Sequence, residues 1–163
     1  YLGSSVRGCC CPPATVQRYQ ARLSGPILDR IDLSVCVDRP AAREVLAAVP
    51  SARETSPEVR ARITAARRRS INRQGCLNAH LRADKLHNCA PEAAALKLLE
   101  RVSDRLGLSP RVTTRMLKVG RSIADLEGSG SVRAEHIAEA FALRLTSSAD
   151  AAEIGRASCR ERV

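Results

Sequence analysis

Aromatic side chains are scarce in this sequence: they account for 2% of its 163 residues, and tryptophan is absent. Proteins that bind single-stranded nucleic acid by stacking bases on aromatic rings need more of them, so the composition argues against that class and against a β-sandwich. No run of about 18 apolar residues occurs, so no segment qualifies as a membrane-spanning helix. With 44% hydrophobic residues, the chain can instead bury an aliphatic, helical core.

Signals for export are also missing. The sequence has no initiator methionine, no basic leader followed by an apolar stretch, and no small-residue cleavage site. Its seven cysteines are an odd number, and three are consecutive at residues 9–11, which does not suit a disulfide framework. These features predict a protein of the reducing cytoplasm.

Acidic residues are few relative to basic ones: the sequence has 17 Asp and Glu but 27 Lys and Arg, which gives a net charge of +10. Such an excess favours binding to a polyanion, and DNA is the expected partner. Much of the positive charge is arginine, which a genome rich in G and C also favours, so the charge alone leaves DNA binding open.

The segment Leu23–Leu33 combines a turn with a charged pair. Residues 24–26 are Ser-Gly-Pro, and the freedom of glycine and the fixed φ of proline both favour a turn. Residues 31–37 alternate apolar and polar side chains and are rich in β-branched residues, which predicts a strand. Asp29 and Arg30 lie where the turn enters this strand. Because lone charges are costly to bury, the pair is either a local salt bridge or is directed at a ligand or partner.

Proline, glycine and short polar residues mark the ends of several predicted helices. A linker at 50–56 separates two short helices from a larger helical group. For the first helix of that group, Ser56 is predicted as the N-cap and Gly75 as the C-terminal stop. The predicted helices are 13–23, 41–49, 56–74, 82–89, 91–106, 109–126 and 132–145.

Arginines dominate the helix predicted at 56–74, where Glu58 is the single acid. Like charges on one helix repel each other and lower its stability somewhat. Two interpretations remain open: the basic face is solvated, or it contacts DNA phosphates or an acidic neighbouring subunit. The candidate interface residues are Arg60, Arg67, Arg68, Arg69 and Arg73.

The helix predicted at 109–126 has two different faces. Its apolar residues follow one another at intervals of four, three, four and three positions, as in a buried seam. The seam consists of Val112, Met116, Val119, Ile123 and Leu126. The opposite face carries Arg111, Arg115, Lys118 and Ser122. Such a cationic stripe is either solvated or binds an anion.

Four blocks of the sequence, in order, resemble the magnesium-chelatase-like AAA+ ATPases, in particular their bacterial ComM/YifB subgroup. The blocks are Tyr1-Leu-Gly…Arg7-Gly-Cys9…Cys11-Pro-Pro13, Arg22-Leu-Ser-Gly-Pro-Ile-Leu-Asp-Arg-Ile-Asp-Leu33, Leu77-Asn-Ala79 and Met116-Leu-Lys-Val-Gly-Arg-Ser-Ile-Ala-Asp-Leu126. The resemblance implies a mixed α/β, mostly α fold. Residues 1–50 are then the C-terminal end of the AAA+ α/β nucleotide-binding core, and residues 51–146 are a helical lid. Residues 147–163 are expected to be a disordered tail, of which 153–163 resemble a translated sequencing adapter.

The resemblance also implies roles for individual residues. Arg30 resembles the arginine finger, which reaches into the nucleotide site of a neighbouring subunit, and Asp29 beside it is a second candidate catalytic residue. Lys118 and Arg115 are the candidates for sensor 2, the lid cation that touches the γ-phosphate of ATP. Relatives usually have arginine at position 118, and lysine cannot make the bidentate contact, so the choice between the two stays open.

ATP and Mg²⁺ are the cofactors that the resemblance implies for the intact protein. It also implies a homo-oligomer, with a hexameric ring expected, which acts on DNA by helicase activity or branch migration. The 163 residues contain no G-x-x-x-x-G-K-[ST] phosphate loop, no acidic Walker B strand and no sensor 1 asparagine. We therefore expect no ATP hydrolysis and no bound cofactor for these residues alone.

For the intact protein the resemblance also implies zinc as a possible cofactor, because Cys9 and Cys11 resemble the second half of a Cys-Pro-Cys-Gly…Cys-x-Cys set of ligands; the alternative is an exposed turn that is prone to oxidation. Two thiolates are half of the four ligands that a structural zinc site usually has.

The sequence also leaves open two alternatives to a DNA motor. One is the motor subunit of magnesium chelatase itself, and the other is a basic helical nucleic-acid-binding or adaptor domain of unrelated ancestry.

Overall fold

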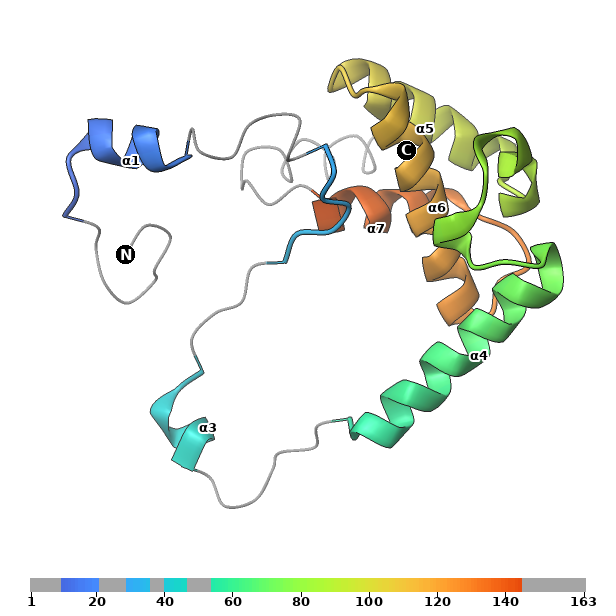
Figure 1. Ribbon diagram of the computed structural model, residues 1–163, viewed down its shortest axis with the longest axis horizontal. Helices are drawn as coiled ribbons and strands as arrows, with labels where there is room; N and C mark the ends of the chain where they lie inside the picture. The colour runs from blue at the N-terminus through green and yellow to red at the C-terminus, as the bar shows by residue number, and fades with distance from the viewer. Residues whose placement is uncertain (1–9, 21–28, 36–39, 47–53, 145–163) are drawn as a thin grey trace, which may run out of the picture. The chain divides into compact units, whose positions relative to one another are not determined.

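The computed structural model of the chain describes residues 10–20, 29–35, 40–46 and 54–144. The chain divides into two units, one made of Tyr1–Ile31 with Cys36–Arg53 and the other of Asp32–Val35 with Glu54–Val163. The first unit contains helices α1 (Pro13–Gln20) and α3 (Ala42–Leu46). The second contains α4 (Ser56–Gln74), the 3-10 helices η1 (Asn78–His80) and η2 (Ala83–Cys89), α5 (Ala93–Arg105), α6 (Pro110–Glu127) and α7 (Ala134–Arg144). The described residues are thus mostly helical (Figure 1).

The strand predicted at 31–37 is wrong for its described part, because residues 31–35 form no strand. A strand needs a neighbour that accepts and donates along its backbone. Between residues 31–35 and the other described elements, the backbone hydrogen bond runs from the Ser34 N–H to the Leu143 carbonyl at the end of α7 (2.6 Å), which is no ladder of paired strands. The apolar positions of the alternating pattern are accordingly uncovered, with Ile31, Leu33 and Val35 exposed to 43%, 50% and 68%.

The N-cap of helix α4 lies one residue earlier than predicted. Thr55, not Ser56, is the N-cap, because Glu58 stands three residues after Thr55 and accepts from both its N–H (2.7 Å) and its Oγ1 (2.8 Å). The predicted stop at Gly75 is confirmed: this residue has φ 75°, the left-handed conformation that glycine adopts without strain. None of the helices in the described part of the chain is long and apolar enough to cross a bilayer.

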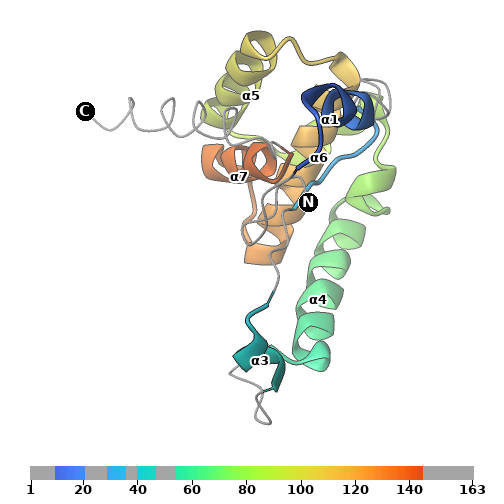
Figure 2. The same ribbon diagram turned by 90° about the vertical axis from the view of Figure 1, so that its left-hand side faces the viewer.

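Helix α6 is the centre of the second unit. Figures 1 and 2 show it between α4 on one side and α5 and α7 on the other. Ser109 caps its start by accepting the Val112 N–H (3.4 Å), Pro110 is its first residue, and it ends at Gly128 in the left-handed conformation. The fully buried core around it includes Cys89, Val112, Met116, Ala124, Val132, Ile137 and Phe141.

The buried face of α6 is rotated from the predicted seam. Val112 and Met116 are buried as predicted, but Leu126 is 44% exposed. The buried residues that follow Met116 along the helix are Leu117, Gly120, Arg121, Ala124 and Asp125. Sequence periodicity missed this face because two of its members are charged, and charged residues are normally assigned to solvent.

Close packing of α6 on α7 depends on Gly120. A Cβ atom at this position would lie 2.8 Å from the Cδ1 atom of Ile137, which is itself fully buried. We expect Gly120→Ala to destabilise the chain by about 1–3 kcal/mol, because overpacking outweighs the better helix propensity of alanine. Urea denaturation measures this change.

Gly130→Ala is the matched control, since a Cβ atom at Gly130 meets nothing within 4 Å. Its free energy of unfolding should stay within about 0.5 kcal/mol of the wild type. Equal stability of the two variants would show that Ile137 moves aside at no cost.

Candidate functional site

A hollow lies against the polar side of α6 in the second unit. It has a volume of about 260 Å³ and is lined by Asp32, Ala79, Arg115, Lys118, Val119 and Ser122. Residues three and four positions apart lie on one face of a helix, so α6 brings its two cations and its hydroxyl together. Both residues predicted as lid cations, Arg115 and Lys118, therefore face the same hollow.

The two cations of the hollow are in different electrostatic situations. Arg115 donates from Nη1 to Oδ1 of Asp32 at 2.6 Å, and these side chains are 27% and 39% exposed. Lys118 is half-buried, and among the described residues its ammonium has no ion pair or hydrogen bond. The described residues that line the hollow thus carry two positive charges and one negative charge, and a phosphate oxygen fits this lining as a ligand.

Ser122 connects this hollow to the interior of the helical unit. Its hydroxyl donates to the Lys118 carbonyl (3.0 Å) and accepts from Nδ2 of Asn78 (3.2 Å). The same Asn78 amide nitrogen donates to Oδ2 of Asp125 at 2.7 Å. A chain of hydrogen bonds therefore runs from α6 through η1 and back to a buried carboxylate.

Asp125 is the centre of a buried ion network that the sequence did not predict. Its Oδ1 accepts from Nη1 of Arg73 (2.7 Å) and from Nη2 of Arg121 (3.0 Å). Its Oδ2 accepts from Nη2 of Arg73 (2.9 Å) and from Asn78. Arg121 is completely buried and also donates to the backbone carbonyls of Ser129 (2.6 Å) and Gly130 (3.0 Å). The network joins α4, η1, α6 and the loop after α6.

Burial by itself raises the pKa of Asp125, but the hydrogen bonds from Arg73 and Asn78 and the charge of Arg121 outweigh it. The pKa of this carboxyl is therefore held below its ordinary value. For Arg121, burial is the largest effect and lowers the pKa, although Asp125 opposes it. An arginine stays protonated at any working pH, so the pair is ionic.

The arginines predicted as an interface on α4 divide into two groups. Arg60, Arg67 and Arg68 are exposed, and we call these three the basic surface. Arg69 is exposed but donates to the Asp125 carbonyl at 2.7 Å, which ties it to α6. The prediction is corrected for Arg73, because its guanidinium donates hydrogen bonds to Asp125 and Asn78 inside the protein. Its spacing on α4 gave no sign of a partner that lies 52 positions further along the chain.

The remaining predicted residues belong to the first unit. Asp29 is half-buried and Arg30 is exposed, and both lie in a turn. Cys11 is exposed, whereas Cys9 lies outside the described residues, as do residues 145–163 with the expected tail. Among the predicted site residues, the structure therefore brings together the two lid cations of the second unit.

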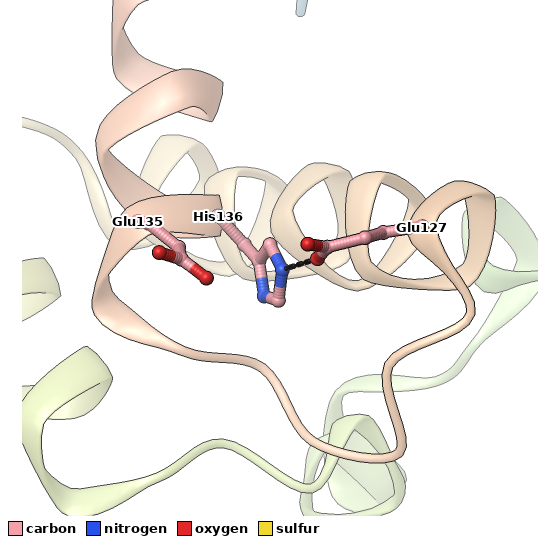
Figure 3. Close-up of side chains that lie close together, drawn as sticks. All are labelled: Glu127, Glu135 and His136. Carbon is pink, nitrogen blue, oxygen red and sulfur yellow. Dashed lines mark hydrogen bonds and ion pairs between the residues drawn. The ribbon is translucent and has the colours of Figure 1, made fainter.

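A group of Glu127, Glu135 and His136 has possible metal ligands within 4.8 Å of one another (Figure 3). Each of these groups is already used by the protein. His136 Nδ1 accepts from the Arg133 N–H (2.9 Å), and its Nε2 bonds to Glu127. The Arg133 guanidinium forms ion pairs with both carboxylates.

These bonds also act on the acid–base chemistry of the group. The hydrogen bond from His136, followed by that from Arg133, lowers the pKa of Glu127. A cation held between two carboxylates leaves them unsuited to a metal ion, and a histidine that accepts at one nitrogen carries its proton on the other. We therefore interpret the group as an ion-pair network that fixes the start of α7.

Comparison with known proteins agrees with this architecture. The family described as "Magnesium chelatase, subunit ChlI C-terminal" matches residues 53–144, and that described as "Magnesium chelatase, subunit ChlI" matches residues 1–45. The uncharacterised protein YifB of Escherichia coli is 39% identical over 145 residues, which are 88% of this chain and 28% of YifB.

Two further relatives extend the comparison. The competence protein ComM of Haemophilus influenzae is 38% identical over 133 residues, which are 81% of this chain and 26% of ComM. An uncharacterised protein of Mycobacterium tuberculosis is 37% identical over 143 residues, which are 85% of this chain and 28% of that protein. The chain thus spans little more than a quarter of the length of these relatives. With its helical second unit, it belongs to the magnesium-chelatase-like family, in the group that includes YifB and ComM.

Proposed function

We propose that this chain is the part of an ATP-driven, magnesium-chelatase-like motor that supplies the arginine finger and the sensor 2 lid, and that the motor acts on DNA. The observation that carries the proposal is the hollow on α6, where Arg115 and Lys118 lie together. A family member with two cations at one phosphate-sized site is suited to holding the terminal phosphate of a nucleotide.

Within the lid, Arg115 and Lys118 make different contributions. Bound ATP with Mg²⁺ supplies the phosphoryl group that is transferred to water. The guanidinium of Arg115 offers a rigid fork of donors, while the ammonium of Lys118 acts as a point charge. Ser122 supports Lys118 by hydrogen bonding to its carbonyl (3.0 Å), so the backbone that carries the lysine is held in place.

Arg30 completes the proposal from the first unit. The residue is exposed in a turn, as a finger that reaches a neighbouring copy of the chain has to be. An arginine supplied from a neighbour stabilises the negative charge that develops on the transferred phosphoryl group. The proposal therefore requires a homo-oligomer, and we propose a hexameric ring.

The basic surface on α4 is proposed to bind DNA. Its arginines can replace condensed counterions on phosphates but contact no base edges, so binding should be weak, sensitive to salt and indifferent to sequence. For the isolated chain, Arg60→Ala with Arg67→Ala should weaken binding. It should also reduce the slope of log K against log salt by up to about 0.9 for each phosphate that is no longer neutralised. Fluorescence anisotropy of labelled duplexes over a salt series measures both.

Lys85→Ala with Lys97→Ala is the matched control, because it removes the same charge from exposed positions on η2 and α5. In the full-length protein, DNA should accelerate ATP hydrolysis, and the Arg60 and Arg67 double variant should lose this acceleration while the control keeps it. If the two double variants behave alike, net charge rather than the basic surface accounts for binding.

A magnesium-chelatase motor is the second candidate, and the match to the magnesium chelatase subunit family favours it. The same experiment separates the two functions, because a chelatase motor has no reason to hydrolyse ATP faster with DNA. Family membership argues against the third interpretation, an adaptor of unrelated ancestry.

A further inference from the structure

One carboxylate stands among the cations of the hollow. Asp32 pairs with Arg115 at 2.6 Å, although the two residues are 83 positions apart in the sequence. Lys118 lines the same hollow and has no ion pair among the described residues. Asp32 therefore neutralises part of a site that, under the proposed function, receives an anion.

The segment that contains Asp32 is attached to the helical unit at two points. Asp32 binds α6 through Arg115, and the Ser34 N–H donates to the Leu143 carbonyl of α7 (2.6 Å). Residues 32–35 group with the second unit, whereas residue 31 groups with the first. Arg30 precedes Asp32 by two residues, so the first anchor on the lid follows the proposed finger almost directly.

We propose that Asp32 is the resident counter-ion of the hollow, that it occupies the place of a phosphate oxygen at Arg115, and that a bound phosphate displaces it and loosens residues 32–35. This inference rests on the proposed role of the lid cations. A carboxylate oxygen and a phosphate oxygen accept the same guanidinium hydrogen bond. The two anions repel each other, so they compete for Arg115 instead of sharing it.

The exchange requires that Asp32 can leave its place without a large penalty. Its side chain is 39% exposed, so a released carboxylate can be hydrated at once. Lys118 then favours the incoming anion, which carries more charge than the single carboxylate it replaces. A partly exposed ion pair contributes little to the stability of the helical unit, so the helices themselves need not rearrange.

Displacement of Asp32 would couple the phosphate site of the lid to the proposed arginine finger, Arg30. When the hollow holds phosphate, residues 32–35 lose the Asp32 anchor, and the chain next to Arg30 becomes less restrained. By linkage, any interaction that restrains this segment must in turn oppose phosphate binding. Phosphate binding to the lid of one subunit would thus change the mobility of the chain next to Arg30, the finger that the same subunit supplies to its neighbour.

Inorganic tripolyphosphate is the probe for a test on the chain itself. The readout is the ¹H–¹⁵N shift of the Lys118 and Ser122 amides during titration, which distinguishes the hollow from binding to arginines elsewhere. Asp32→Asn should bind about fivefold more tightly than the wild type, because tripolyphosphate then has no ion pair to displace from Arg115. Hydrogen exchange of the Ser34 amide should accelerate when tripolyphosphate is added to the wild type.

Two control variants test whether a change in affinity comes from the Asp32 carboxylate itself. Asp84→Asn makes the same change in net charge at an exposed position and should bind as the wild type does. Asp32→Glu keeps the competing carboxylate and should stay near wild-type affinity. Equal affinity of Asp32→Asn and wild type overturns this inference alone. The absence of any shift at Lys118 and Ser122 in every variant overturns it together with the proposed role of the lid cations.

Discussion

Replacing Arg30 by alanine in the full-length protein is expected to lower ATP hydrolysis by about 10²-fold or more, the scale of losing a finger supplied by a neighbour. The side chain is exposed in a turn, so its removal should leave the thermal midpoint nearly unchanged. Binding of ATP should also persist, because in the proposed ring the phosphate loop of that site belongs to the neighbouring subunit. Steady-state hydrolysis, nucleotide binding and melting curves measure the three quantities separately.

Further variants distinguish a finger from an ordinary surface arginine. Arg30→Lys should restore little activity, because an ammonium lacks the planar fork of a guanidinium. Mixing Arg30→Ala with a phosphate-loop variant should recover some hydrolysis, since each defective subunit contributes its intact half to a shared site. Arg43→Ala, at an exposed position on α3, is the matched control and should hydrolyse ATP normally. If Arg30→Ala instead unfolds the protein and leaves turnover per folded molecule unchanged, Arg30 is a structural salt-bridge partner.

Helix ends were predictable from the sequence because their signals are local. Pro110 begins α6 behind the capping Ser109, and Gly75 and Gly128 end α4 and α6 with a positive φ. Each of these residues acts through its own backbone or that of a residue within one turn. Thr55 shows the limit of this reasoning, because the choice between two adjacent hydroxyl residues depended on where Glu58 could reach.

Partners that are distant in the sequence were not predictable. The spacing of Arg115 and Lys118 placed both cations on one face of α6, which the structure bears out. Nothing local to α6 identified Asp32 as the ion-pair partner of Arg115, and nothing local to α4 showed that Arg73 pairs with Asp125 inside the protein. The alternating pattern at 31–37 failed for the same reason, because a strand is decided by the neighbour that pairs with it.

The charged residues on the buried face of α6 give the second large prediction. Asp125 receives hydrogen bonds from Arg73, Arg121 and Asn78, and its own side chain is 2% exposed. Asp125→Ala removes the acceptor and leaves the completely buried Arg121 without its counter-ion. Removing one partner of a buried ion pair lowers the free energy of unfolding by about 3–5 kcal/mol, which is a large part of the stability of a small domain.

The pH dependence of this stability follows from the direction of the Asp125 pKa. The folded pKa is held below the value of the unfolded chain, about 3.9, so the stabilisation is fully present above that pH. It is lost as the pH falls through the folded pKa of Asp125. The gap in unfolding free energy between the wild type and Asp125→Ala should therefore be constant near neutrality and should narrow in strong acid.

Urea denaturation at pH 7 and at acidic pH tests both parts of this prediction, with Asp84→Ala as the matched control. Asp84 also pairs with an arginine, Arg82, at 3.0 Å, but both side chains are exposed. Its removal should change the free energy of unfolding by no more than about 0.5 kcal/mol, because solvent screens such a pair. A loss of several kcal/mol at Asp125 and almost none at Asp84 would show that burial, not ion pairing as such, makes the network structural. If the two variants lose equal stability, Asp125 is not needed to stabilise this helical unit. The prediction of Arg73 as an interface residue on α4 would then stand again.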